Sequence, residues 1–245
     1  MATNHFKPVA TFDIELSAPL ACFTDPILKV ERTSYPAPTE GALEYIIQAI
    51  YGHPPVRYMI NRVKIMNPVK PYPIYMNECE NIGVVDLETG EVYKPEYTSK
   101  DTPPTAFQRM TTYLANVRYE VNFTMYYDKD FYRRNGLPVK SGECAAKHID
   151  TLRRRIKKGQ SQYTPYMGLS ECCCDFVESD GKGEADKSVN ADYVSLYRVY
   201  HMDDYNSGTS FVHVKIKDGV LDFTKCIVLV GDKTMTREEF LNWRP

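Results

Sequence analysis

The segment VRYEVNFTMY, residues 117–126, alternates apolar and polar side chains along its length. Alternation with a period of two is typical of a β-strand that buries one face and exposes the other. The apolar face of this strand would carry Tyr119, Val121, Phe123 and Met125. Residues 9–16 repeat the pattern, with an apolar face made of Ala10, Phe12, Ile14 and Leu16. These segments predict a sheet with a buried face.

Helices alternate with strands around these two segments. Thr39 can cap a helix that runs to Tyr51 and carries an apolar stripe of Leu43, Ile46, Ile47 and Ile50. A second helix is predicted for residues 143–158, and further strands for residues 56–67 and 171–177. The resulting order is strand–helix–strand–strand–helix–strand. This is the order of the α+β, ferredoxin-like fold, which is a frequent scaffold for RNA binding.

The remaining residues predict an insertion and a β-rich end. Residues 68–105 are rich in proline, glycine and turn residues, which predicts a hairpin around residues 88–90 followed by a loop. Residues 179–190 are polar and predict an exposed loop or linker. Strands are predicted at 192–200, 210–217 and 226–230. We therefore expect a ferredoxin-like domain over residues 1–178 and a smaller β-rich region over residues 179–245.

The composition limits the classes of protein to which this chain can belong. The chain has 245 residues and a formal net charge of −2, and 43% of its residues are hydrophobic. No segment is apolar enough for a signal peptide or a membrane span, so a cytoplasmic protein is expected. Seven cysteines include Cys172, Cys173 and Cys174. On a strand these three would face alternate sides and could not share one metal, which predicts reduced, mostly buried thiols and no metal site.

The predicted second helix is strongly basic. Residues 146–160 hold six Lys or Arg residues against a single acid, Asp150. A basic block in a near-neutral chain favours a polyanionic partner, although a solvated helix face is the common alternative. The candidate phosphate-binding residues are Lys147, Arg153, Arg154, Arg155, Lys157 and Lys158.

His148 and Tyr51 are the candidates for chemistry. On a helix, His148 falls at the border between the buried stripe and the cationic face, where its proton affinity could be tuned for general base catalysis. The alternative is a packed or solvated side chain. Tyr51 ends the first helix, and taken alone it fits an aromatic ring packed on the sheet better than a catalytic group. His53 precedes two prolines and is expected to be structural or to face solvent.

Short motifs in a fixed order carry a family resemblance. The motifs are CFTDP (22–26), SYPAPT (34–39), AIYGHP (49–54), VxxMxPV (63–69), NE (77–78), KH (147–148), RRIxKGQ (154–160) and PYMGxxEC (165–172). Taken together, they closely resemble the Cas-five family of CRISPR systems, subtype I-C (Dvulg type), whose members are RAMP proteins with a ferredoxin-like domain.

The resemblance implies a function and a site. A subtype I-C member cuts the CRISPR precursor transcript within each repeat, without a metal or other cofactor, and stays on the 5′ handle of the product, the crRNA. Its catalytic tyrosine, lysine and histidine match Tyr51, Lys147 and His148. Its partners would be the Cas-seven backbone subunit and the Cas-eight large subunit of the type I-C Cascade complex.

Two other interpretations stay open at the level of sequence. Members of other subtypes do not cleave RNA, so this chain could be a non-catalytic Cascade subunit that binds the crRNA 5′ handle. Outside the family, a ferredoxin-like protein that binds a phosphate ligand would also explain the basic helix.

Overall fold

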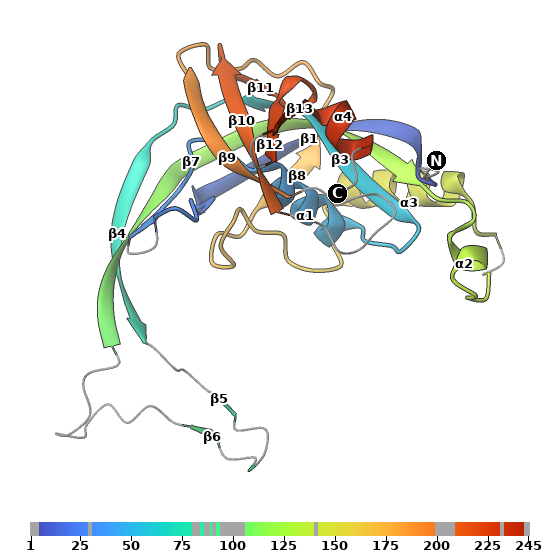
Figure 1. The fold of residues 1–245 in the computed structure, drawn as a ribbon, viewed down its shortest axis with the longest axis horizontal. Helices are drawn as coiled ribbons and strands as arrows, with labels where there is room; N and C mark the ends of the chain where they lie inside the picture. The colour runs from blue at the N-terminus through green and yellow to red at the C-terminus, as the bar shows by residue number, and fades with distance from the viewer. Residues whose placement is uncertain are drawn as a thin grey trace.

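The computed structural model describes residues 5–28, 31–79, 84–85, 89, 92–93, 106–139, 142–198, 209–230 and 233–242. Most of them form an 11-stranded, largely antiparallel sheet that few helices cover, which makes the fold α+β (Figure 1). The helices are α1 (Glu40–Ile50), α2 (Phe131–Arg134), α3 (Ala145–Lys158), α4 (Arg237–Asn242) and the 3₁₀ helix η1 (Phe223–Lys225). The strands are β1 (Lys7–Ala21), β2 (Arg32–Thr33), β3 (Val56–Ile65), β4 (Pro71–Cys79), β5 (Val84–Val85), β6 (Val92–Tyr93), β7 (Ala106–Tyr127), β8 (Asp175–Glu178), β9 (Ala191–Arg198), β10 (Thr209–Lys217), β11 (Val220–Asp222), β12 (Ile227–Val230) and β13 (Lys233–Thr236).

Four strands in the order β3-β7-β1-β8, with β8 at the edge of the sheet, carry the two main helices, and each of the four is antiparallel to the next. The predicted alternation is confirmed, because Val121 on β7 pairs with Ile14 on β1 and both side chains are fully buried. Helix α1 follows β1 and β2 in the chain and precedes β3, whereas α3 lies between β7 and β8. Both helices contact this part of the sheet and each other.

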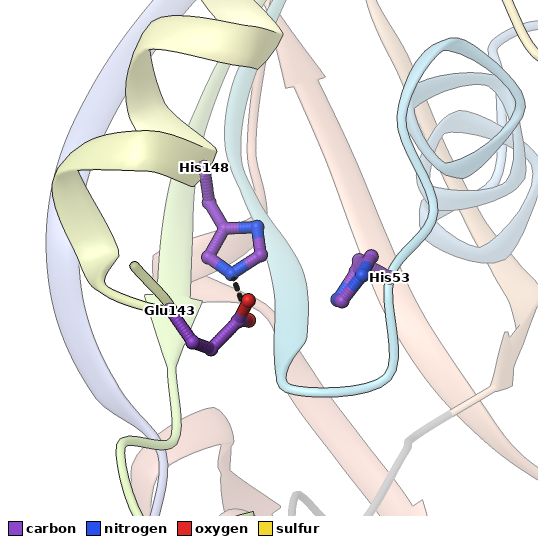
Figure 2. Close-up of side chains that lie close together, drawn as sticks. All are labelled: His53, Glu143 and His148. Atoms are coloured by element: carbon purple, nitrogen blue, oxygen red, sulfur yellow. Dashed lines mark hydrogen bonds and ion pairs between the residues drawn. The ribbon is translucent and has the colours of Figure 1, made fainter. Parts of the chain in front are cut away.

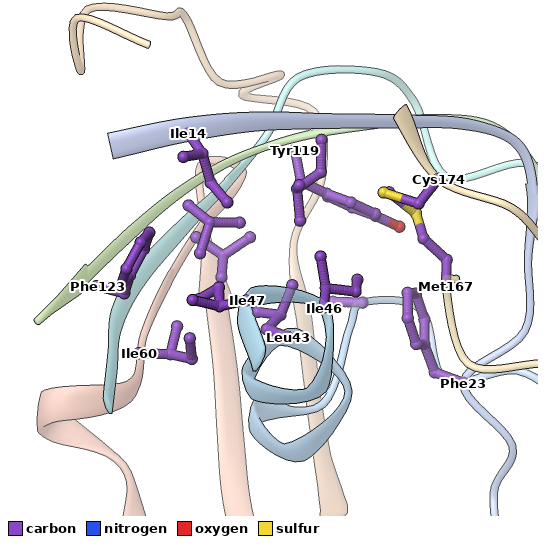
Figure 3. Packing of buried hydrophobic residues seen from close by; sticks show 14 of the residues in the cluster. Ile14, Phe23, Leu43, Ile46, Ile47, Ile60, Tyr119, Phe123, Met167 and Cys174 are labelled. Atoms are coloured by element: carbon purple, nitrogen blue, oxygen red, sulfur yellow. The ribbon is translucent and has the colours of Figure 1, made fainter. Parts of the chain in front are cut away.

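Helix α1 begins and ends as predicted. The Thr39 side chain accepts a hydrogen bond from the backbone N–H of Ala42, which satisfies one of the free donors of the first turn. Its apolar stripe, which includes Leu43, Ile46 and Ile47, packs onto the sheet beside Tyr119 (Figure 3). Burying each such aliphatic side chain contributes about 1.5–3 kcal/mol.

Strand β4, in the predicted insertion, and the first part of β7 form an arm that extends away from the rest of the sheet (Figure 1). Strand β4 pairs with the first part of β7, from Ala106 to Leu114, so β7 begins well before the predicted residue 117. The alternation of apolar residues is weaker there because residues 108–110 are not buried, and burial begins only at Thr111. Strands β5 and β6 pair with each other, which confirms the chain reversal predicted around residues 88–90. The loop predicted after it lies outside the described residues.

Residues 171–177 were predicted as one strand, and this was partly wrong. Strand β8 begins only at Asp175, because the backbone before it bonds locally: Cys174 N–H donates to the carbonyl of Pro165, and Met167 N–H donates to that of Cys172. The cysteines nevertheless alternate, with Cys172 and Cys174 buried and Cys173 exposed. Among the described cysteines, none forms a disulfide.

The prediction of an exposed linker at residues 179–190 was also wrong in part. Lys64 Nζ lies 2.6 Å from Glu120 Oε1 and also donates to the carbonyl of Gly181 at 2.7 Å. The hydroxyl of Ser179 and the backbone N–H of Gly183 donate to Glu120. The segment therefore packs against the sheet, because this ion pair between β3 and β7 supplies hydrogen-bond partners for its backbone.

The C-terminal strands continue the same sheet. Predicted strands near 192–200, 210–217 and 226–230 are confirmed as β9, β10 and β12, whereas β11, β13 and α4 were not predicted. Strand β11 pairs with β3, and Arg237 on α4 forms a buried ion pair with Glu40 on α1. Arg237 also donates to the carbonyl of Ile60 at 2.6 Å.

No described helix combines the length and the apolar composition needed to cross a bilayer.

Candidate active site

Tyr51 stands where α1 ends. It is the C-cap residue, with extended backbone angles, and its N–H still donates to the carbonyl of Ile47. The hydroxyl of Tyr58 on β3 donates to the carbonyl of Tyr51 at 2.6 Å. These two bonds fix the backbone at the end of α1, so that the phenol ring points toward the first turn of α3 rather than along the sheet.

His148 lies in that first turn. Its Nδ1 is 2.6 Å from the hydroxyl oxygen of Tyr51, a contact between residues 97 positions apart in the chain. The rings of His53 and Tyr127 also lie close, with centroids 4.8 Å and 5.3 Å from that of His148. The imidazole is fully buried, which is more burial than its position at the border of the helix predicted. The rings of Tyr51, His53 and Tyr127 cover the side of His148 that an isolated helix would expose.

Glu143 completes the arrangement and was not predicted from the sequence. Its Oε1 lies 2.6 Å from Nε2 of His148, and its Oε2 lies 2.9 Å from Nζ of Lys147. The carboxylate side chain is only 2% exposed. The available sequence signal was the spacing of Glu143 and Lys147, which are four residues apart. That spacing is common on helix surfaces and gave no reason to expect a bond to His148.

The charges in this cluster determine which of its atoms carry a hydrogen and donate, and which accept. Burial alone would raise the pKa of Glu143, but hydrogen bonds from Lys147 and His148 lower it below its ordinary value, so the group is a carboxylate and only accepts. Burial raises the pKa of Tyr51, so its hydroxyl keeps its proton and donates. In neutral His148, Nε2 therefore carries the hydrogen and donates to Glu143, whereas Nδ1 accepts from Tyr51.

Lys147 is the accessible member of the cluster. Its side chain is 42% exposed, whereas the imidazole beside it is enclosed. The hydrogen bond to Glu143 raises the pKa of Lys147, so the ammonium stays charged. An ammonium carries three donors, and one bond to Glu143 leaves two that can point toward solvent or a phosphate.

The basic block of α3 divides into two kinds of residue. Arg155 faces inward: its Nη1 donates to the carbonyl of Ile50 at 2.7 Å, and its Cζ lies 5.1 Å from the ring centroid of Tyr51. This guanidinium ties α3 to the end of α1 and holds the tyrosine ring. The remaining cations of the block, Arg153, Arg154, Lys157 and Lys158, are exposed. Arg153 is the least free of these four, because its Cζ lies 5.9 Å from the ring centroid of Phe12 on β1 and its Nη1 lies 3.7 Å from Asp150.

The predicted residues Tyr51, Lys147 and His148 thus meet in one hydrogen-bonded cluster at the junction of α1 and α3. The family model described as CRISPR-associated protein (Cas_Cas5) matches residues 11–223, which include all of them. The chain belongs to this CRISPR-associated Cas5 family. An unrelated ferredoxin-like binder of a phosphate ligand is therefore excluded as an alternative.

Relatives of this Cas5 protein are similar at the level of sequence and fold. A protein of Thermus thermophilus named CRISPR pre-crRNA endoribonuclease Cas5d is 30% identical over 175 residues, covering 71% of this chain and 66% of that protein. A protein of the same name from Mannheimia succiniciproducens is 27% identical, covering 82% of this chain and 89% of that protein. A solved structure titled as a CRISPR-associated protein has a TM-score of 0.62 at 22% identity, covering 89% of this chain and 93% of its own. The structure of a functionally uncharacterized protein of Streptococcus mutans, SMU1763c, has a TM-score of 0.59 at 20% identity, covering 88% of this chain and 93% of that protein.

A cavity of about 640 Å³ adjoins the cluster in this Cas5 protein. Its lining includes Lys7, Tyr127, Lys129 and Glu143. On the loop after α1, His53 faces Glu143 and His148 (Figure 2). His53 is partly buried by its stacking on Tyr51, so the prediction that it is structural or faces solvent holds only in part.

Proposed function

We propose that this protein is a metal-independent endoribonuclease that cuts CRISPR precursor RNA within the repeat. It would then remain on the crRNA 5′ handle, as a subunit of a type I-C Cascade with a Cas-seven backbone and a Cas-eight large subunit. The observation that carries the proposal is the 2.6 Å hydrogen bond between Tyr51 and His148, which Glu143 and Lys147 extend into one cluster. Two relatives named as pre-crRNA endoribonucleases support it.

The cluster holds the groups that such a reaction needs. The 2′-OH of the RNA bonds to the Tyr51 oxygen and attacks the adjacent phosphorus. As the O2′–P bond forms, the 2′-OH proton passes to Tyr51 while the Tyr51 proton passes to Nδ1 of His148. Glu143 stabilises the resulting imidazolium.

Lys147 would act on the phosphate. Its ammonium bonds to the oxygens of the phosphorane and offsets the charge that develops there. The P–O5′ bond then breaks, and the leaving oxygen takes a proton from solvent. The products are a 2′,3′-cyclic phosphate and a 5′-OH, and His148 returns its extra proton to solvent before the next cycle.

The outer face of α3 would hold the RNA backbone. Its exposed cations, Arg153, Arg154, Lys157 and Lys158, follow one another along a helix whose first turn carries the catalytic cluster. Phosphate contacts of this kind fix the register of the RNA and carry no base specificity. Arg155 would contribute indirectly, by holding Tyr51.

We also propose a ferredoxin-like unit for this Cas5 protein, with residues 1–178 as the main domain and residues 179–245 as a β-rich extension. The central order β3-β7-β1-β8 and the positions of α1 and α3 between these strands support it. In this unit the cluster lies where the two helices meet, and both helices are anchored to the sheet.

A non-catalytic subunit that binds the crRNA 5′ handle is the second candidate. The observation that favours it is burial: His148 is fully enclosed, and Glu143 bonds to both His148 and Lys147. A phosphodiester could reach the imidazole only after a neighbouring side chain moves. In this candidate the same hydrogen bonds would only join α1 to α3.

One experiment separates the two. The purified protein is incubated with a CRISPR repeat hairpin RNA in EDTA, alongside the same RNA carrying a 2′-deoxy nucleotide at the cut position. We expect cleavage of the first RNA and none of the second. An RNA that is bound tightly but stays intact would favour the non-catalytic subunit, and cleavage that requires magnesium would contradict the mechanism.

A further inference from the structure

His53, Glu143 and His148 form a compact group of metal-ligating side chains. Each offers one ligand atom, and the three atoms lie within 4.8 Å of one another. His53 comes from the loop between α1 and β3, whereas Glu143 immediately precedes the N-cap of α3 and His148 lies in the first turn of that helix (Figure 2). The side chains of Glu143 and His148 are almost fully buried, so they are already withdrawn from bulk water.

We propose that these three residues bind a divalent ion of the zinc class, and that the bound ion switches off the RNA-cleaving cluster. Two imidazoles and one carboxylate match the ligand set of known three-ligand zinc sites, which leave a fourth position for water. Magnesium and calcium prefer oxygen ligands, and this group offers only one carboxylate. The inhibitory consequence rests on the proposed function, whereas ion binding does not.

The geometry requires only small shifts, in which Glu143 and His148 separate slightly to admit the ion and His53 moves closer. Zinc bonds of about 2.0–2.2 Å to nitrogen and oxygen hold tetrahedral ligand atoms roughly 3.3 Å apart. Glu143 and His148 are already in contact, with 2.6 Å between Oε1 and Nε2. His53 would therefore make the main movement, and it lies on the connection between α1 and β3 rather than inside either element.

A bound ion would stop cleavage because it changes which nitrogen of His148 carries the hydrogen. Nε2 faces Glu143 and carries that hydrogen in the metal-free cluster. A metal ion bound to Nε2 takes its place, so the neutral ring carries its hydrogen on Nδ1 instead. Nδ1 then donates to the Tyr51 oxygen and can no longer accept a proton from it. The ion also occupies the Glu143 carboxylate, which would have stabilised the imidazolium.

Binding is tested directly with zinc chloride on protein freed of metal by EDTA and then dialysed. Calorimetry or competition with a coloured chelator gives the stoichiometry and the affinity, and cobalt(II) reports tetrahedral coordination by its visible absorption. The variant is His53→Gln, and the matched control is His213→Gln, because His213 on β10 is exposed and pairs with Asp192. We expect one zinc ion at this site in the wild type and the control, and affinity at least about tenfold weaker in His53→Gln.

Inhibition is measured separately, as the ratio of the cleavage rate in EDTA to the cleavage rate in excess zinc. Each protein cleaves repeat RNA under single-turnover conditions, once in EDTA and once in excess zinc. We expect zinc to slow the wild type and His213→Gln at least about tenfold, as expected when general base catalysis is lost. The His53→Gln protein should cleave at the same rate in EDTA and in zinc, whatever that rate is. Magnesium should not inhibit the wild type or either variant.

Three results would overturn the inference. These are absence of zinc binding, zinc affinity that is equal in the wild type and His53→Gln, and binding at this site without any slowing of an active enzyme. Zinc held by the cysteines instead would give the second result, because their thiols are untouched by the substitution. If the wild type proves inactive in EDTA, the proposed function fails, and the binding measurements still decide whether the metal site exists.

Discussion

Oε1 of Glu143 lies 2.6 Å from Nε2 of His148, on the side of the imidazole ring opposite Tyr51. A carboxylate in this position holds the ring in one tautomer and orientation and stabilises it when it becomes charged. Glu143 is therefore a positioning residue, one step removed from the RNA. It also links the imidazole to Lys147, so one acid holds both the imidazole and the ammonium of the site.

Glu143→Gln should slow cleavage by about 100-fold, within the range that general acid–base catalysis contributes. The amide removes the charge that favours the imidazolium, and its NH₂ group can face the ring instead of its oxygen. Nitrogen NMR of His148 supplies a readout that a purely structural role would not change. Nε2 should carry the hydrogen in the wild type, and this preference should weaken in the variant. An unchanged tautomer together with an unchanged rate would contradict the role of Glu143.

Glu143 should also make folding stability depend on pH in mild acid. Its pKa is lowered in the folded protein, below the ordinary 4.5, so the unfolded chain binds the proton more readily. Stability from this group is present above the unfolded pKa and is lost as the pH falls through the folded pKa. Urea unfolding between about pH 3 and pH 6 should show a shallower loss of stability in Glu143→Gln than in the wild type. An equal slope in both proteins would mean that the pKa of Glu143 is not lowered.

Arg154→Ala should weaken RNA binding and reduce its salt dependence. One lost phosphate contact lowers the slope of log affinity against log salt by about 0.7–1. The matched control is Lys225→Ala, since Lys225 is also exposed but lies on η1 and pairs with Asp222. Binding titrations at several salt concentrations should change for Arg154→Ala only. Equal slopes for the two variants would argue against an RNA contact at this position of α3.

Gly168→Ala should destabilise the protein by about 3 kcal/mol or more. Gly168 has φ +88°, and a Cβ atom there would overlap the carbonyl oxygen of Cys22. Gly159 provides the comparison, because it has φ +61° but no heavy atom lies within 4 Å of the position that a Cβ atom would take. Gly159→Ala should therefore cost only about 1 kcal/mol, for the left-handed backbone alone. Denaturant unfolding of both variants measures the difference, and equal losses would exclude the steric contact.

Much of the central sheet was predictable because its strands bury one face. Ile14 and Val121 belong to clear alternations, and Thr39 marks the start of α1 by its capping chemistry. The arm and β11 were harder to predict. Burial in the first part of β7 begins only at Thr111, and β11 has only three residues, so neither produces a long periodic signal.

The site was only partly predictable for a different reason. Tyr51, Lys147 and His148 came from the family resemblance, and nothing local in the sequence indicated that the first and last of these touch. Glu143 stands outside α3 and precedes its N-cap residue, so helical periodicity does not reach it. His53 joins the group only because the loop after α1 turns toward α3. These contacts depend on tertiary packing, which one-dimensional patterns do not record.

The proposed mechanism depends most on His148, and one paired measurement tests it. His148→Asn and His213→Asn are compared with the wild type for single-turnover cleavage of a repeat RNA in EDTA and for affinity toward the same RNA, after unfolding curves show that each is folded. We expect His148→Asn to lose cleavage by at least about 100-fold while its affinity stays within about threefold, since proton transfer contributes to the reaction and not to binding. His213→Asn should match the wild type in both. Near-normal cleavage by a folded His148→Asn protein would contradict the mechanism.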